Sequence, residues 1–354
     1  MAAMTPRERV QTAWRRQEPD CVPKHATFVP HQLEQVREHT GQTPQEAFGL
    51  EMRYVGIRPP QVAPDFSRYL PPDLPEGTTI TEWGMAEKPG SFYHFTEYVH
   101  LMAPLREVSE LEDWPFPDYY DDARYAGLAE EVAEWHAQGY FCTGHLGHIF
   151  ETSWYMRSME QLFLDFSVNR PFAERLLEEV TMRQLHKAVQ FAKAGVDAIH
   201  TGDDIGTQRG MMMSPKTWRT WFKPRWARVM AAAKAVNPDL LIIYHSDGDM
   251  SAVIPELSEI GIDVLNPVQP ECLDVAEVKR LYGDRLAFFG GMGIQTTMPF
   301  GTAQEVRDET RRLIEILGDG GGYLIAPTHT LEPEVPWENI VAFFEAVEQY
   351  GSYG

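Results

Sequence analysis

The chain has 354 residues, of which 43% are hydrophobic and 23% charged, and its formal net charge at pH 7 is −21. This composition is typical of a globular protein with a large core, and the length allows one large domain or two smaller ones. The negative charge argues against nucleic acid and anionic membrane as partners, because both require surfaces rich in lysine and arginine.

The sequence contains no segment that predicts membrane insertion or secretion. No apolar run approaches the roughly 20 residues that span a bilayer. The N-terminal stretch MAAMTPRERVQTAWRRQEPD is charged throughout and lacks the apolar core of a signal peptide. The cysteines Cys21, Cys142 and Cys272 have no CxxC spacing and predict no disulfide framework. We therefore expect a cytoplasmic protein.

The first hundred residues predict few regular elements. Thr5–Arg16 is a predicted helix, since a threonine can cap it and a proline occupies its first helical position. Val22–Phe28 and Met52–Ile57 are candidate strands. Residues 78–102 alternate in places between polar and apolar and break at Lys88-Pro89-Gly90, which predicts an inserted hairpin.

The rest of the chain alternates between strands and helices. A helix is expected from Tyr120 to Gln138. The expected strands after it are Tyr140–Leu146, Asp197–Thr201, Leu240–His245, Asp263–Pro267, Leu286–Gly290 and Tyr323–Ala326. The expected helices between and after them are Glu151–Phe166, Pro171–Ala194, Pro215–Ala235, Ile254–Ile260, Val275–Tyr282, Ala303–Leu317 and Trp337–Gln349.

With the two early candidates, this makes eight strands that have helical partners. Such a pattern favours a closed (β/α)8 TIM barrel, with an N-terminal extension and the inserted hairpin, over an open doubly wound sheet. We expect residues 1–354 to form a single barrel domain. No glycine-rich nucleotide-binding motif follows any of the strands.

The stretch Leu240–Met250, LLIIYHSDGDM, is the most informative in the chain. Its apolar run predicts a strand buried on both faces, which ends in a polar loop. If the backbone stays extended, His245 and Asp247 project to the same side. The carboxyl ends of such strands are where barrel enzymes carry their chemistry.

Other ionisable side chains are expected at the same edge of the barrel. They are Asp203, Asp204, His145, His148, Glu151, His329, and either His25 or His31. The functional hypothesis is a divalent metal held by His245, Asp247 and His329, because imidazole and carboxylate suit Zn²⁺ and also Fe²⁺. The alternative is that Asp247 and Asp249 cap the following turn and His245 is a buried structural histidine.

The remaining candidates also have two interpretations. Asp203 and Asp204 can bind a metal, orient a cationic group or act as acid and base, because adjacent carboxylates push their pKa values apart. Alternatively, they cap the turn at 206–213. Glu151 and His148 are either ligands or groups at a helix N-terminus. Tyr155 is a core residue unless its helix faces the barrel mouth.

Several long stretches in the same order resemble the uroporphyrinogen decarboxylase (URO-D) superfamily. This superfamily includes the decarboxylases of haem synthesis and zinc-dependent methyltransferases that work with corrinoid proteins, and its fold is a (β/α)8 barrel. The matching stretches are the opening TPRERVQTAWRRQEPDCVP and the segments Ser214–Val229, Tyr244–Glu271, Phe288–Val306 and Gly320–Val347.

The key positions are similar to both branches of the superfamily. His245 matches the histidine of the His-x-Cys pair in the methyltransferases, but Asp247 stands at the cysteine and His329 at the second cysteine. His329 and Tyr155 match a functional histidine and tyrosine of the decarboxylases, and Glu51 falls near their pocket-lining aspartate. Their arginine-rich segment R-Q-A-G-R-Y is absent, and residues 29–32 read VPHQ instead.

The resemblance therefore implies an enzyme closer to the methyltransferase branch. We expect metal-dependent methyl transfer to or from a small molecule, with zinc favoured over iron, a corrinoid protein as partner, and pairing into a homodimer. The expected catalytic residues are Tyr155, Asp203, Asp204 and His329, the last of which is also an expected metal ligand. The expected substrate-binding residues are Glu51, His148 and Glu151. The alternative is a metal-free decarboxylase that acts on a porphyrinogen or a smaller carboxylic acid, with His329 and Tyr155 as proton donors. A non-catalytic corrinoid- or tetrapyrrole-binding barrel is a third hypothesis.

Overall fold

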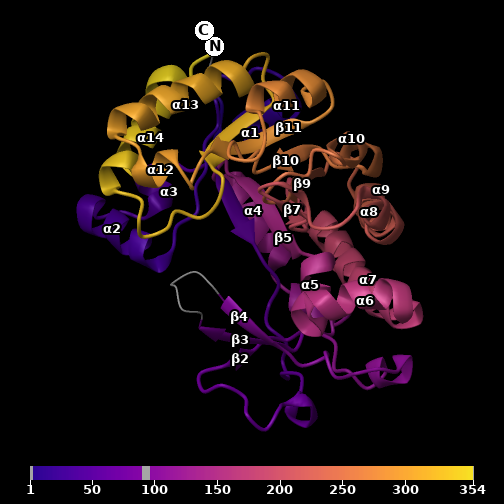
Figure 1. Cartoon of the computed structure of the whole chain (residues 1–354). Helices are drawn as coiled ribbons and strands as arrows, with labels where there is room; N and C mark the ends of the chain where they lie inside the picture. Colours follow the sequence, from indigo (N-terminus) through magenta and orange to yellow (C-terminus); the bar gives the residue numbers. More distant parts are fainter. Residues whose placement is uncertain (1–2, 90–95, 354) are drawn as a thin grey trace.

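The strand and helix pattern folds into a seven-stranded parallel sheet surrounded by helices (Figure 1). The structure is a computed structural model that describes residues 3–89 and 96–353. In their order across the sheet, the strands are β1 (Met52–Val55), β5 (Phe141–Gly147), β6 (Ala198–Gly202), β9 (Leu241–His245), β10 (Val264–Asn266), β11 (Ala287–Met292) and β12 (Tyr323–Pro327).

The sheet curls, so that its first and last strands share one inner core. Met52 on β1 and Leu324 on β12 belong to the same buried cluster, which also contains residues from the five strands between them. Trp14, on helix α1 (Pro6–Trp14), joins this cluster and packs edge-on against Phe141 with ring centroids 5.2 Å apart. The side chains that alternate with these along each strand point outward and form the larger core between the sheet and the helices, as expected for strands buried on both faces.

The predicted first strand, Val22–Phe28, does not form a regular strand, and the eight-stranded closed barrel is not confirmed. The segment runs beside β12 and makes only isolated parallel bridges to β12 and to the residue Leu331 beyond it. Pro23 has no N–H to donate, although its carbonyl accepts from Ile325 at 2.9 Å. On the other side, the Lys24 N–H donates to the Glu51 carboxylate at 2.9 Å. A side chain thus takes a donor that would otherwise pair with a backbone carbonyl.

The inserted segment forms a small antiparallel sheet of β2 (Thr79–Ile80), β3 (Met85–Pro89) and β4 (Thr96–His100). It lies at the end of the molecule away from the two chain termini, near helix α5 (Figure 1). The connection between β3 and β4 falls at residues 90–95, outside the described residues. The turn of the predicted hairpin therefore stays a prediction. A further short pair, β7 (Gly206–Thr207) and β8 (Gly210–Met211), follows β6.

Not all of the helices around the sheet follow the predicted ranges: those at 30–40, 44–47 and 297–300 had no predicted range, and the one predicted from Tyr120 begins at Leu128. The helices are α2 (Pro30–Thr40), α3 (Pro44–Ala47), α4 (Leu128–Ala137), α5 (Phe150–Arg157), α6 (Met159–Val168), α7 (Arg170–Ala194), α8 (Pro215–Trp221), α9 (Lys223–Val236), α10 (Ile254–Leu257), α11 (Val275–Tyr282), α12 (Thr297–Phe300), α13 (Ala303–Leu317) and α14 (Trp337–Tyr350). Among the described residues, no helix has the length and apolar character needed to cross a membrane.

Two predicted helices are each divided. The predicted helix Glu151–Phe166 breaks at Ser158, whose φ is +73°, into α5 and α6. The break lets the fully buried Arg157 bind Asp165 at 2.7 Å and the carbonyl of Met102 at 2.7 Å. The predicted helix Pro215–Ala235 divides at Phe222, since Pro224 lies in the first turn of a new helix, α9.

Candidate active site

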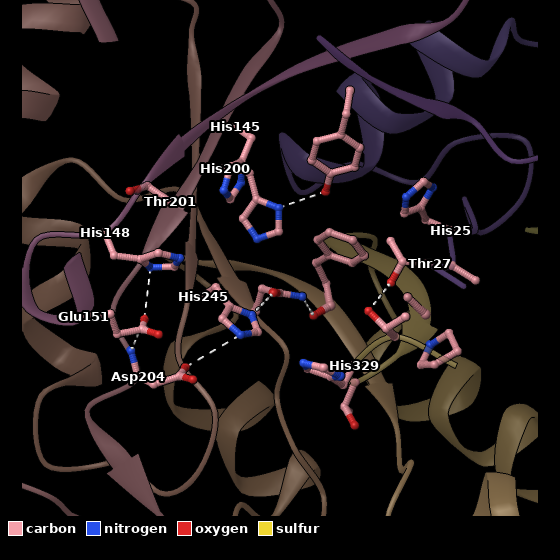
Figure 2. Close-up of a pocket in the computed structure, with 18 of the residues that line it drawn as sticks. His25, Thr27, His145, His148, Glu151, His200, Thr201, Asp204, His245 and His329 are labelled. Atoms are coloured by element: carbon pink, nitrogen blue, oxygen red, sulfur yellow. Dashed lines mark hydrogen bonds and ion pairs between the residues drawn. The ribbon is translucent and has the colours of Figure 1, made fainter. Parts of the chain in front are cut away.

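The carboxyl ends of the strands surround a cavity of about 380 Å³ (Figure 2). Its floor continues the inner face of the sheet, because every second residue of a strand points inward. The inward side chains that line it are Tyr54, His145, His200, His245, Asn266 and Phe289. A second cavity of about 680 Å³ adjoins it and shares the lining residues Tyr155, Asp204, Thr328, His329 and Thr330.

His200 is a cavity residue that the sequence analysis did not identify. It lies within β6, two positions after the inward Ala198, so the period-2 alternation was the signal that could have located it. Its Nδ1 lies 2.8 Å from the hydroxyl of Tyr54. Burial lowers the pKa of His200 well below its usual value and that of His145 to about 4. His145 and His200 are therefore neutral at pH 7.

Asp204, His245 and Asp247 form a compact cluster at the rim. Their ligand atoms lie within 4.8 Å of one another. The Nε2 atom of His245 lies 3.6 Å from Oδ1 of Asp204 and 3.7 Å from Oδ1 of Asp247. The backbone N–H of Asp247 also donates to the carboxylate of Asp204 at 2.8 Å. The cluster therefore contains His245 and Asp247 of the predicted ligand set, with Asp204 as the third member.

Asn266, on the neighbouring strand β10, sets the orientation of His245. Its amide nitrogen donates to the carbonyl of Phe289 at 2.9 Å, which turns the amide oxygen towards His245. Nδ1 of His245 donates to that oxygen at 2.6 Å. The imidazole thus carries a proton on Nδ1 and directs Nε2, the atom that is left to bind a metal ion, towards the two carboxylates.

Close backbone contact brings the two aspartates together. Asp204 lies two residues before Gly206, and Asp247 lies directly before Gly248. A Cβ at Gly206 would lie 2.5 Å from the carbonyl oxygen of Asp247, and one at Gly248 would lie 2.6 Å from the carbonyl carbon of Gly206. Only glycine allows the loops after β6 and β9 to pack this closely.

The cluster favours added positive charge. Burial disfavours a charge on His245, but Asp204 and Asp247 outweigh it and raise its pKa. Burial also raises the pKa of Asp204, and the carboxylates of Glu151 and Asp247 act in the same direction. Two carboxylates and a pre-oriented imidazole are suitable ligands for a divalent metal ion, so the donor set fits such a group.

A second group of ionisable side chains lies beside this cluster, on the start of α5 and the end of β5. Nδ1 of His148 lies 3.0 Å from Glu151, whose other oxygen accepts from the hydroxyl of Tyr155 at 2.9 Å. The backbone N–H of Asp204 donates to Glu151 at 2.9 Å. Burial disfavours both charges, but the pair stabilises itself, so the pKa of His148 is raised and that of Glu151 lowered. All four residues line the cavity.

Asp203 differs from its neighbour Asp204 because it lies outside the cavity lining and is fully buried. Its Oδ1 accepts from the backbone N–H groups of Ile149, Phe150 and Glu151 at 2.9, 2.7 and 3.3 Å. Its Oδ2 accepts from the indole of Trp226 at 2.7 Å. Asp203 thus caps the start of α5 and connects it to α9, instead of capping the turn at 206–213. We remove it from the catalytic set.

The structure also places the remaining four candidates, His329, Glu51, His25 and His31, which the sequence could not distinguish by position. His329 lines both cavities but is not part of the compact cluster of Asp204, His245 and Asp247. Glu51 precedes β1, at the amino ends of the strands, where its carboxylate binds Arg9 and Lys24. It lines neither cavity, so we remove it from the substrate-binding set. His31 is exposed on α2, whereas His25 lines the cavity.

The lining of the cavities carries carboxylates and histidines without lysine or arginine among the described residues. Such a lining offers no fixed cation that could pair with a carboxylate of a bound molecule. The one raised pKa among the histidines away from the cluster belongs to His148, and Glu151 already pairs with it.

The fold and this rim of ionisable groups define a barrel-type α/β enzyme. The chain belongs to the uroporphyrinogen decarboxylase (URO-D) family, whose profile matches residues 86–350. The predicted superfamily is thus confirmed.

Known proteins of both branches are similar to the chain. It is 26% identical over 189 residues to the methylcobamide:CoM methyltransferase MtaA of Methanosarcina barkeri, an alignment that covers 53% of this chain and 52% of that protein. It is 25% identical over 144 residues to the uroporphyrinogen decarboxylase of Nostoc punctiforme, which covers 40% of this chain and 38% of that protein. The chain thus spans about half the length, or less, of these curated relatives.

A solved methyltransferase from Methanosarcina mazei has the same fold. It aligns with a TM-score of 0.71 at 18% identity and covers 98% of this chain and 99% of that chain. This similarity extends to the N-terminal residues, which lie outside the matched family region.

Proposed function

We propose that the chain is a metal-dependent methyltransferase or demethylase that exchanges a methyl group between a small molecule and a corrinoid protein. The observation that carries this proposal is the cluster of Asp204, His245 and Asp247, oriented by Asn266 at the carboxyl ends of β6 and β9. The methyltransferase among the relatives supports the same reaction class.

Asp204, His245 and Asp247 would hold the metal, with zinc as the first choice and iron as the second. His329 lines the same cavity and could supply a further ligand or hold the substrate. When bound, the metal would act as a Lewis acid on the atom that carries the methyl group. Carboxylates in place of thiolates make this a harder ligand set than sulfur-ligated zinc.

The neighbouring groups of the chain would handle the proton of the leaving atom. His148 is protonated at pH 7, since its raised pKa comes from the adjacent Glu151. It can donate a proton to an alcohol or amine that departs from its methyl group. Tyr155 donates to Glu151 and so fixes the carboxylate that pairs with His148.

The alternative, metal-free decarboxylation with His329 and Tyr155 as proton donors, has less support. Uroporphyrinogen carries eight carboxylates, and no lysine or arginine among the described residues lines either cavity. A smaller acid would face the same carboxylate-rich rim.

Metal analysis of the purified protein tests the proposal. We expect about one equivalent of divalent metal per chain, lost in H245A and D247A. D249N is the matched control, because Asp249 lies two residues away and its carboxylate caps the backbone N–H of Ser251 instead. Equal metal contents in all four proteins would contradict the proposed ligands.

A methyl-transfer assay tests the reaction. Free cob(I)alamin can stand in for the corrinoid partner, and the visible spectrum reports methylcobalamin formed from methylated alcohols, ethers or amines. We expect formation with the metal-loaded protein and none with D247A. Metal-free protein that releases CO₂ from uroporphyrinogen would favour the alternative.

A further inference from the structure

One wall of the cavity carries buried polar atoms that have no partner in the protein. His25 is 5% exposed, and neither of its ring nitrogens has a hydrogen-bond partner among the described residues. Thr328 is 3% exposed, and its hydroxyl oxygen is in the same situation. Both side chains line the cavity (Figure 2 labels His25). Buried polar groups of native proteins are nearly always hydrogen-bonded, so two such groups in one cavity point to a bound molecule.

This wall lies opposite the cluster of Asp204, His245 and Asp247. His25 belongs to the segment beside β12, and three strands, β12, β11 and β10, separate that segment from β9, which carries His245. In the other direction the strands between them are β1, β5 and β6, so the two positions lie across the curled sheet from each other. Figure 2 shows the same arrangement, with His25 on one side of the cavity and Asp204 on the other.

The chemistry of this wall suits an uncharged group. Burial lowers the pKa of His25 to about 4, so its imidazole is neutral at pH 7 and offers one donor and one acceptor. The threonine hydroxyl likewise donates and accepts. A carboxylate would find no lysine or arginine among the described lining residues. A hydroxyl or carbonyl group suits the hydrogen-bonding capacity of each side chain and carries no charge into the cavity.

Aromatic rings line the cavity between the His25 wall and the cluster of Asp204, His245 and Asp247. Tyr54 and Phe289 line the cavity beside His25, with ring centroids 5.8 and 6.1 Å from that of His25. An apolar spacer, such as an aromatic ring, would pack against them.

We propose that His25 and Thr328 form a second subsite, which binds an uncharged hydroxyl or carbonyl group at the end of the substrate remote from its methyl group. The inference rests on the proposed function, because it takes the rim cluster to hold the reacting end. It narrows the substrate to small neutral molecules with a methyl-bearing atom at one end and a hydrogen-bonding group at the other.

Calorimetric titration of the full chain with three probes tests this subsite. All three probes are aromatic methyl ethers. Opposite the ether, 4-methoxyphenol carries a hydroxyl, methoxybenzene carries only hydrogen and 4-methoxybenzoate carries a carboxylate. We expect 4-methoxyphenol to bind roughly tenfold more tightly than methoxybenzene, because a net hydrogen bond is worth about one decade in affinity. We expect 4-methoxybenzoate to bind most weakly.

H25F and T328V should each reduce the preference for the hydroxyl while methoxybenzene binds as before. Phenylalanine keeps a ring against Tyr54 and Phe289, and T328V is a second variant of nearly the same shape in case H25F folds poorly. H39F is the control, because His39 is exposed on α2 and stacks on Trp337 with ring centroids 4.5 Å apart. It should bind all three probes as the wild type does.

Wild-type protein that does not prefer 4-methoxyphenol, or a preference that survives in both H25F and T328V, would overturn the subsite. Repeating the titration with D247A separates this inference from the proposed function. Loss of metal without loss of the hydroxyl preference supports the subsite. Metal binding and methyl transfer that persist in the wild type without any hydroxyl preference refute the subsite alone.

Discussion

Asn266 holds His245 in one tautomer, since its amide oxygen accepts from Nδ1 at 2.6 Å while its amide nitrogen donates to a backbone carbonyl. The two residues lie on adjacent strands and face each other in the β9–β10 register. The orientation of the imidazole is therefore built into the sheet and does not depend on a bound metal. Metal affinity should therefore depend on Asn266.

N266A should weaken metal binding roughly 10- to 100-fold, the usual effect of removing a group that orients a metal-binding histidine. Without the acceptor on Nδ1, His245 can change tautomer and rotate. Competition against a chromophoric chelator measures the affinity. N237A is the control, because Asn237 lies outside the cavities, where its side chain accepts from the N–H of Asp239. An unchanged affinity in N266A would show that the imidazole needs no such support.

The order of elements was predictable, and the closure of the sheet was not. Apolar runs such as Leu240–His245 identify strands because both faces are buried, and the structure has β9 at Leu241–His245. The sequence of Val22–Phe28 predicts a strand equally well, but whether its backbone pairs with a neighbouring strand depends on the residues that surround it in the fold. Whether Lys24 bonds to a backbone carbonyl or to Glu51 is decided by a residue 27 positions away.

The site was predictable as an edge of the sheet and less so residue by residue. The rule of strand ends located His245, Asp247 and Asp204. It did not find Asn266, which lies at the last position of β10 and is an amide without ionisable chemistry. The rule also cannot separate Asp203 from Asp204, because adjacent residues of an irregular loop point in different directions that only the packed structure defines.

The neighbours Asp203 and Asp204 should respond differently to the same exchange. D203N places an amide donor opposite either the N–H groups at the start of α5 or the indole N–H of Trp226. We expect its free energy of unfolding to fall by about 2–4 kcal/mol, the cost of unsatisfied buried donors. D204N should lose metal while it changes stability by less than about 1 kcal/mol. Urea denaturation of metal-free protein measures both, and equal losses in the two variants would contradict the assignment.

Replacing Ser158, at the break between α5 and α6, with glycine should stabilise the protein. Its φ of +73° and ψ of 146° lie in a region that is essentially restricted to glycine. S158G should raise the free energy of unfolding by about 1 kcal/mol, since glycine also caps helices nearly as well as serine. S158A keeps the strained backbone and loses the hydroxyl that accepts from Gln161 at 3.2 Å, so it should lower stability by about 1 kcal/mol. Thermal unfolding of the pair checks the opposite signs.

Lys187 should make the free energy of unfolding depend on pH in the alkaline range. It is 8% exposed on α7, and its Nζ donates to the carbonyl of Leu146 on β5 at 3.1 Å. Burial lowers its pKa from 10.5 to about 8. Between pH 8 and pH 10.5 the unfolded chain therefore binds more protons at this site than the native chain does, so the contribution of Lys187 to stability rises with pH.

K187M removes this dependence. Relative to K187M, the wild type should gain up to about 3 kcal/mol in free energy of unfolding as the pH rises from 7 to 10.5. Urea denaturation at intervals of pH measures the difference, in which all other titrating groups cancel. K193M is the control for the loss of a lysine from the same helix, because Lys193 is exposed and the buried ammonium of Lys187 stays in place in this variant. A constant difference between K187M and the wild type would mean that Lys187 stays charged in the native protein over the whole range.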